Sequence, residues 1–237
     1  MSLDPRLPKL AGGWALQRHP VADGLDARLF VPAAPDELLD DEAVIERNEF
    51  NDSMPYWAWL WDSAPAMARR IAASPPSPGA RILELGAGLG LVGIAAALVT
   101  PGRAELTLTD HDPLSLAALP LNAELNGLHG VRVWDLDWRE LERAEDGAFD
   151  LVLGCDVAYE ARLQGPLLDV VERYLAPGGV ALFADPGRTR FPGLLRRVRE
   201  RGLVAEVEDA EGRPAEPEPG ALRIVRIARH PEDLSGT

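Results

Sequence analysis

The chain has 237 residues, 46% of them hydrophobic, so it is long and apolar enough for one large domain with a buried core. Its formal net charge of −14 argues against binding to nucleic acid, and no apolar run reaches the length of a membrane span, about 18 residues. The first residues lack the apolar core of a secretion signal and Cys155 is the only cysteine, so no internal disulfide is possible and we expect a cytoplasmic protein.

The N-terminal segment is rich in proline and acidic side chains and shows little regular pattern. Residues 27–31 are compatible with a short strand, and residues 35–45 with a short helix that Asp36 would cap. We expect an N-terminal extension, residues 1–53, that packs on the edge of the main domain, residues 54–237.

Tryptophans at every second position follow, at Trp57, Trp59 and Trp61. Because a period of two does not fit a helix, we expect an extended segment before a helix that begins near Asp62 or Ser63. Large aromatic side chains serve either a core or a ligand site. For Trp57 and Trp59 the sequence leaves both interpretations open.

The stretch RILELGAGLG has the features of a ligand-binding strand and loop. Its apolar residues suit a strand buried on both faces, while Glu84 needs a polar partner there. Gly86, Gly88 and Gly90 permit a tight turn and let backbone N–H groups approach a ligand closely. Residues 91–98 suit a helix whose N-terminus points at that ligand, so the unit predicts a nucleotide-type site.

The spacing of the glycines separates this site from two common phosphate sites. A dinucleotide fingerprint needs a third glycine where the chain has Leu91, and a P-loop needs a lysine that is absent here. The E-x-G-x-G-x-G spacing instead resembles the first motif of class I S-adenosylmethionine-dependent methyltransferases. The resemblance implies a cofactor without phosphates, whose ammonium group a carboxylate can bind and whose carboxylate backbone N–H groups can bind.

A second strand is predicted at residues 104–109, and it ends in Asp110. This acid lies about 20 residues after the glycines, where a carboxylate can accept hydrogen bonds from both hydroxyls of a ribose. The next helix begins near Pro113. Asp112 is better placed to cap that helix, which leaves Asp110 for a ligand.

The rest of the chain alternates strands and helices, which predicts an α/β fold with a doubly wound sheet. In such sheets, ligands lie at the carboxyl ends of the strands, where residues 137–138, 156–159 and 185–188 also fall. The further elements we expect are strands at 131–135, 149–154 and 180–184 (the last after a turn at 177–179), helices at 114–126, 163–175 and 192–201, and a terminal hairpin of residues 203–207 and 222–228.

Five stretches together resemble the family-16 group of S-adenosylmethionine-dependent lysine methyltransferases: PYWAWLWDSA, ILELGAGLG, TDHDPLSLAALPLNAELNGL, LGCDVAYE and ADPGR. Within this group, the chain is most similar to the branch of the electron-transfer flavoprotein β-subunit lysine methyltransferases and its bacterial relatives. The resemblance covers residues 54–190. It implies a Rossmann-like doubly wound seven-stranded sheet of order 3-2-1-4-5-7-6 with an antiparallel last strand.

The resemblance also implies which residues contact S-adenosylmethionine. Glu84 and the glycines would lie on the methionine side, Asp110 at the ribose, and Trp138 beside the adenine ring. Cys155 would contribute mainly its backbone. The full set that the resemblance assigns to the cofactor is Trp61, Glu84, Gly86, Gly88, Gly90, Asp110, Trp138 and Cys155.

Asp156 and Tyr159 match the D-x-x-Y/F signature of the family at the methyl end. Methyl transfer is an in-line displacement, so the enzyme mainly positions the nucleophile and excludes water. A lysine amine, with a pKa of about 10.4, must lose a proton before it attacks. An aromatic face can hold the cationic side chain, and an aspartate can orient the amine. Arg188 either binds an acidic part of the substrate or braces its loop.

We therefore expect a protein lysine methyltransferase, with the electron-transfer flavoprotein β-subunit as substrate. The alternative is a nicotinamide-like small-molecule N-methyltransferase, which a closed pocket over Asp156 would favour. Intact Glu84, Asp110 and Asp156 argue against a non-catalytic cofactor-binding protein. A nucleic-acid methyltransferase would need an N/D-P-P-Y-like loop where the chain reads CDVAY, and the scattered histidines predict no metal site.

Overall fold

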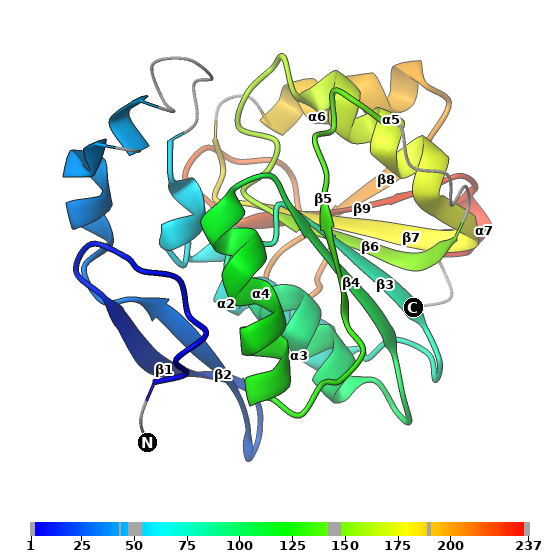
Figure 1. Cartoon of the computed structure of the whole chain (residues 1–237). Helices are drawn as coiled ribbons and strands as arrows, with labels where there is room; N and C mark the ends of the chain where they lie inside the picture. Colours follow the sequence, from blue (N-terminus) through cyan, green and yellow to red (C-terminus); the bar gives the residue numbers. More distant parts are fainter. Residues whose placement is uncertain (1–2, 43, 47–53, 142–147, 189–190, 235–237) are drawn as a thin grey trace.

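The structure is a computed structural model that describes residues 3–42, 44–46, 54–141, 148–188 and 191–234. Its main sheet has seven strands in the order β5-β4-β3-β6-β7-β9-β8 (Figure 1). The strands are β3 (Arg81–Leu85), β4 (Glu105–Asp110), β5 (Arg132–Asp135), β6 (Phe149–Cys155), β7 (Leu175–Asp185), β8 (Val204–Glu208) and β9 (Arg223–Ala228).

The predicted sheet topology is confirmed. When the strands are counted from β3, the order is 3-2-1-4-5-7-6. The last strand, β9, runs antiparallel to both of its neighbours, while the pairs from β5 through β7 are parallel. The predicted terminal hairpin is the β8–β9 pair.

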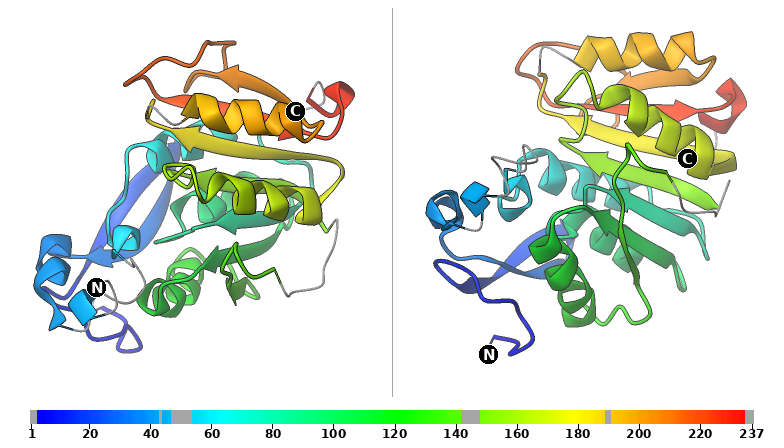
Figure 2. Two further views of the ribbon diagram at one scale, coloured as in Figure 1. Left: turned by 90° about the horizontal axis from the view of Figure 1, so that it is seen from above. Right: turned by 45° about the horizontal axis from the view of Figure 1, so that its top comes forward.

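Helices cover both faces of this sheet (Figures 1 and 2). Side chains alternate along β3, so that Ile82 belongs to the core on one face while Leu83 and Leu85 belong to the core on the other. This two-sided burial explains the nearly continuous apolar run of the strand. One face carries α2 (Ser63–Ala73), α3 (Leu91–Val99) and α4 (Pro113–Leu125), and the other carries α5 (Gln164–Tyr174) and α6 (Phe191–Glu200); a short α7 (Pro231–Leu234) follows β9.

The predicted turn at residues 177–179 is wrong. These residues lie inside β7, which already pairs with β6 at Leu175. The register between the two strands then shifts, and Gly178 has a φ of +77°. An irregularity of this kind absorbs extra residues without ending a strand, so a Pro-Gly-Gly run does not have to be a turn.

The N-terminal segment is more regular than its composition predicts. It forms an antiparallel hairpin of β1 (Trp14–Ala22) and β2 (Leu25–Pro32), and only the second strand was expected. The helix expected at residues 35–45 begins as the 3₁₀ helix η1 (Pro35–Asp40), with Ala34 and not Asp36 at its N-cap position, and residues 42 and 44–46 are helical as well. Pro35 begins the turn because its fixed φ suits a first helical position, so Asp36 falls inside the first turn.

Two asparagines of α4 attach this hairpin to the main domain. The buried Asn122 side chain accepts from the N–H of Phe30 (2.7 Å) and donates to the carbonyl of Phe30 (3.2 Å) and of Leu89 in the glycine loop (2.9 Å). Asn126 pairs in the same way with both backbone groups of Arg28. The backbone of one edge of β2 is thus hydrogen-bonded to side-chain amides of α4. The boundary predicted between residues 53 and 54 borders on 47–53, which lie outside the described residues, and it stays a prediction.

Replacing Asn122 with alanine is expected to lower the free energy of unfolding by at least about 2 kcal/mol. The change leaves two buried backbone carbonyls and one N–H without their partner, and each such group costs about 1–3 kcal/mol. Urea unfolding checks this. Asn126→Ala, at a part-buried position, is the control with a smaller loss. Equal stability of Asn122→Ala and the wild type would contradict the role of this contact.

Candidate active site

A cavity of about 600 Å³ lies at the carboxyl ends of β3, β4, β5 and β6. The sequence-predicted site residues that line it are Trp61, Glu84, Gly86, Gly88, Asp110, Trp138, Cys155, Asp156 and Tyr159, and Trp57 and Trp59 line it as well. Two predicted residues, Gly90 and Arg188, do not line it. The structure therefore brings together side chains from four strand ends and from the segment before α2.

The glycine loop is closely packed against its surroundings. Gly86 and Gly88 have positive φ values of 58° and 54°, which side chains rarely adopt. A Cβ atom on Gly88 would lie 3.3 Å from the carbonyl oxygen of Trp57. Gly90 instead begins α3 and donates its N–H to the carbonyl of Ala87 (2.7 Å). Gly90 packs against the core side chains of Leu108 and Leu119 and therefore does not line the cavity.

Glu84 finds its polar partner in the first turn of α3. Its Oε2 accepts from the N–H of Gly93 (2.8 Å), and only 3% of the residue is exposed. Burial raises the pKa of Glu84 to about 8, while the backbone N–H groups of the helix oppose that rise. The expected need for a polar partner is confirmed, and the acid ties the strand to the helix that follows the glycine loop.

The carboxylate of Asp110 binds the backbone of the glycine loop. Its Oδ2 accepts from the N–H of Gly88 (2.7 Å), and its Oδ1 accepts from the N–H groups of His111 and Asp112 (2.7 and 2.9 Å). The predicted cap is confirmed, because Asp112 accepts from the N–H of Leu114 (2.8 Å). Asp110 is thus engaged by backbone donors, but an ionised carboxylate offers about four acceptor positions and this one also lines the cavity.

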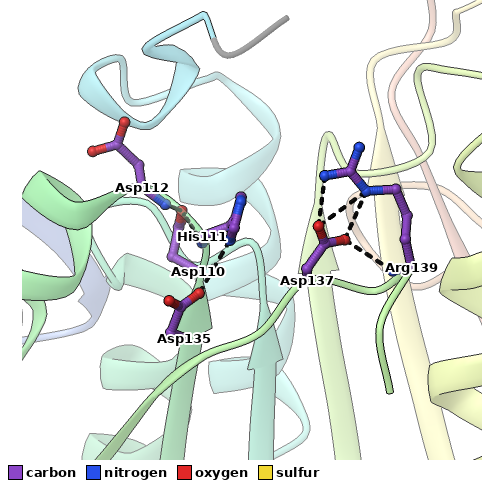
Figure 3. A network of polar contacts seen from close by, with 6 residues as sticks. All are labelled: Asp110, His111, Asp112, Asp135, Asp137 and Arg139. Atoms are coloured by element: carbon purple, nitrogen blue, oxygen red, sulfur yellow. Dashed lines mark hydrogen bonds and ion pairs between the residues drawn. The ribbon is translucent and has the colours of Figure 1, made fainter. Parts of the chain in front are cut away.

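Two further acidic side chains of the cavity wall, Asp135 and Asp137, have basic or cationic partners, as Figure 3 shows. Asp135 contacts the Nδ1 atom of His111 at 3.1 Å. Asp137 accepts from the guanidinium of Arg139, which lowers the pKa of that carboxyl. Trp138 lies between Asp137 and Arg139 in the sequence and lines the cavity. A Cβ atom added to Gly86 would lie 3.5 Å from the Trp138 ring. This part of the cavity wall therefore combines paired polar side chains with an aromatic face.

The cavity wall also contains Asp156, which has an unusual backbone conformation. With a φ of 60°, it is the one non-glycine residue of the described chain in the left-handed region. Such a conformation costs about 1–3 kcal/mol and is concentrated at functional sites. The side chain is only 9% exposed and forms an ion pair with Arg188. Burial raises the pKa of Asp156, and Arg188 opposes that rise.

Three aromatic rings form a wall beside Asp156. The ring of Tyr56 meets that of Tyr159 edge to face, with centroids 5.8 Å apart, and meets that of Trp61 at 6.3 Å. Tyr56 is 45% exposed and Trp61 is 41% exposed, so the cavity opens to solvent along this wall. Sequence reasoning missed Tyr56, although it stands directly before the three tryptophans.

The two uncertain tryptophans and Cys155 can now be placed. Trp57, in the 3₁₀ helix η2 (Tyr56–Ala58), is buried with its ring 6.1 Å from that of Trp14, so its side chain serves the core. Trp59 is half-buried, packs against the same core and also lines the cavity. Burial raises the pKa of the Cys155 thiol well above its usual value, which does not suit a nucleophile.

Within the described ranges, we find no group of three or more metal-ligating side chains and no helix able to cross a membrane.

Comparison with known proteins gives concordant results. The sequence model of the lysine methyltransferase family matches residues 45–191. The chain is 33% identical over 143 residues to the mouse electron transfer flavoprotein beta subunit lysine methyltransferase, covering 60% of this chain and 54% of that one. It is 35% identical over 157 residues to protein N-lysine methyltransferase METTL21A of Danio rerio, covering 63% and 70%.

The chain thus spans about half the length of the mouse relative. Among solved structures, the ribosomal protein L11 methylase of Lactobacillus delbrueckii subsp. bulgaricus aligns with a TM-score of 0.56 and 18% identity, over 72% of this chain and 80% of that one. That likeness concerns the fold alone. The family match extends over most of the segment that builds the cavity, from before α2 to the start of α6. The chain belongs to the lysine methyltransferase family.

Proposed function

We propose that this protein is an S-adenosylmethionine-dependent methyltransferase that methylates lysine side chains of a protein. The observation that carries the proposal is one cavity lined by two groups of residues. A glycine loop and Asp110 form the first group, and Asp156 and Tyr159 form the second. Membership of the lysine methyltransferase family supports the same activity.

The residues present fit the proposed cofactor. Gly86 and Gly88 allow close approach to the loop backbone, Asp110 offers carboxylate acceptors, and Trp138 offers an aromatic face. Glu84 also lines the cavity and would supply an acid at the methionine side. When bound, S-adenosylmethionine supplies an electrophilic methyl group on a sulfonium.

Asp156 and the aromatic side chains beside it would bind the methyl acceptor. Asp156 would orient the amine of the lysine, and the Tyr159 ring would attract its cationic form before the proton is lost. The exposed rings of Tyr56 and Trp61 would pack along the aliphatic part of the side chain and keep water out. Holding the amine in line with the methyl group is the main contribution asked of the protein.

The open aromatic wall favours a protein substrate over a small molecule. A nicotinamide-like substrate would be bound best by a closed pocket, whereas Tyr56 and Trp61 remain exposed beside Asp156. The similarity to the mouse relative over 143 residues supports the electron-transfer flavoprotein β-subunit as the substrate. We propose a cytoplasmic setting, in keeping with a single cysteine.

The proposal is tested by radiolabelled methyl transfer into a lysate from a strain that lacks this protein. We expect one labelled band whose hydrolysate contains methylated lysine, and mass spectrometry identifies the protein. A parallel reaction with nicotinamide tests the alternative. Label in the small molecule with none in lysine would refute protein methylation, and a band other than the flavoprotein subunit would refute the specific substrate.

Replacing Tyr56 with alanine is expected to raise KM for the protein substrate about 10-fold while cofactor affinity stays near that of the wild type. The change removes the ring that contacts both Tyr159 and Trp61, and aromatic pairs contribute about 0.5–1.5 kcal/mol beyond burial. Steady-state kinetics and calorimetry with the cofactor check this. Tyr56→Phe keeps the ring and serves as the control; a similar KM for both variants would contradict the role of the ring.

A further inference from the structure

Arg188 lies in a loop whose backbone is tightly fixed. After β7, the Oδ1 atom of Asp185 accepts from the N–H groups of Gly187 (2.9 Å) and Arg188 (2.6 Å). Gly187 has a φ of +83°, and its carbonyl accepts from the N–H of Gly220 (2.9 Å). A Cβ on Gly187 would lie 2.5 Å from the nitrogen of Ala221. The direction of the arginine side chain is thus set by the sheet and by the loop before β9.

The guanidinium of Arg188 contacts three groups at the methyl end of the site. Its Nη1 atom forms an ion pair with Oδ1 of Asp156 and lies 3.6 Å from Oδ2 of Asp185. The centre of the guanidinium is 6.0 Å from the centroid of the Tyr159 ring. Arg188 is 30% exposed, whereas the two acids are 9% and 3% exposed. A single cation therefore serves two buried carboxylates and borders the aromatic wall.

We propose that Arg188 is a positioning residue for Asp156, and that their ion pair holds the Asp156 carboxyl group in place in the cavity wall. The inference rests on the proposed function, because it assigns a task to Asp156 in that reaction. It replaces the idea that Arg188 binds an acidic substrate group. Arg188 does not line the cavity, and its guanidinium already faces two protein carboxylates.

The charges around Asp156 explain why such a residue is needed. Asp185 at the end of β7 and Asp62 before α2 both face it with like charge, and burial also favours its neutral form. Among the described groups, Arg188 is the cation that counters these effects and lowers the pKa of Asp156. Arginine suits the task because it stays protonated at every pH of interest. A neutral carboxyl would present a proton to the lysine amine and could not accept its hydrogen bond equally at both oxygens.

The experiment compares Arg188→Met and Arg188→Lys with the wild type in kcat/KM for the labelled protein substrate, from about pH 5.5 to about 9. Loss of the cation raises the pKa of Asp156, so the acid limb of the profile should move to higher pH. We expect a shift of about one unit or more in Arg188→Met and a smaller one in Arg188→Lys, which keeps the charge. Cofactor affinity by calorimetry should stay within about threefold of the wild type, because Arg188 does not line the cavity.

Arg201→Met is the matched control. Arg201 is 26% exposed and pairs with Asp169 and Glu172 on α5, away from the cavity. Its pH profile should match the wild type. If Arg188→Met loses rate without a shift of the acid limb, or if its pH profile matches that of Arg201→Met, the positioning role is overturned.

A second readout does not need turnover. The carboxyl carbon signal of Asp156, assigned by its loss in Asp156→Asn, should titrate at higher pH in Arg188→Met than in the wild type. An unchanged titration overturns the inference even if the wild type is active. A wild type that labels no lysine, combined with the expected titration shift, would instead refute the proposed function and leave the Asp156–Arg188 coupling supported.

Discussion

Asp156→Asn is expected to lower methyl transfer at least about 100-fold while cofactor affinity stays within about threefold of the wild type. The expectation follows from the contacts of Asp156, which lines the cavity and forms an ion pair with Arg188, whereas the carboxylate of Asp110 binds the N–H of Gly88 in the glycine loop. Loss of a group that orients a nucleophile costs orders of magnitude in rate because small misplacements are enough to slow an in-line reaction.

Asp156→Asn is a better test than Asp156→Ala because it removes the charge of the side chain without adding backbone strain. Asp156 has a φ of 60°, a conformation that asparagine tolerates and alanine does not. Asp156→Ala should also abolish labelling, but its loop is free to relax. Labelling of the purified substrate and calorimetry with the cofactor provide the measurement. An equal loss of activity and of cofactor affinity would contradict the assignment of Asp156 to the acceptor side.

The second large effect concerns Glu84 and stability. Burial raises the pKa of Glu84 to about 8 in the folded protein, from an ordinary value of 4.5. Between these values, the folded state binds more protons than the unfolded state, so the free energy of unfolding falls as pH rises. The stabilising contribution is fully present below about pH 4.5 and is lost as pH rises through about 8. The full difference in the free energy of unfolding is on the order of 5 kcal/mol.

Glu84→Gln removes this titration and keeps an acceptor for the N–H of Gly93. We expect its stability to change less than that of the wild type between about pH 5.5 and about pH 8, as measured by urea unfolding at each pH. Glu208→Gln is the control, because Glu208 is also buried but is held by Arg70 in an ion pair. If the wild type and Glu84→Gln respond to pH in the same way, the buried acid is not the cause.

The main sheet could be predicted from local pattern because its strands carry their own signal. An apolar run followed by glycines marks β3, and the same kind of run marks β6. The cap at Asp112 and the start of α2 at Ser63 were also predicted, since both depend on a few neighbouring residues. By contrast, β1 reads WALQRHPVA and is mostly exposed or half-buried, so its sequence gives no clear alternation.

The sequence predicted which strand ends form the site, but it did not predict the contacts between their side chains. The sequence assigned Asp156 and the loop with Arg188 to the same edge of the sheet, yet their ion pair depends on how the β7 loop is clamped by residues 218–221. Tyr56 acquires its importance from Tyr159, about a hundred positions away in the chain. Contacts of this kind are set by packing between distant segments, which no local pattern encodes.

The attachment of the N-terminal hairpin through Asn122 limits how the chain can be shortened. The same amide group that binds both backbone groups of Phe30 also binds the carbonyl of Leu89. A fragment that starts after the hairpin would leave this amide half-satisfied next to the glycine turn, and water would replace β2 against α4. The hairpin therefore supports the glycine loop from outside, and a shortened fragment has to retain it to keep that loop in place.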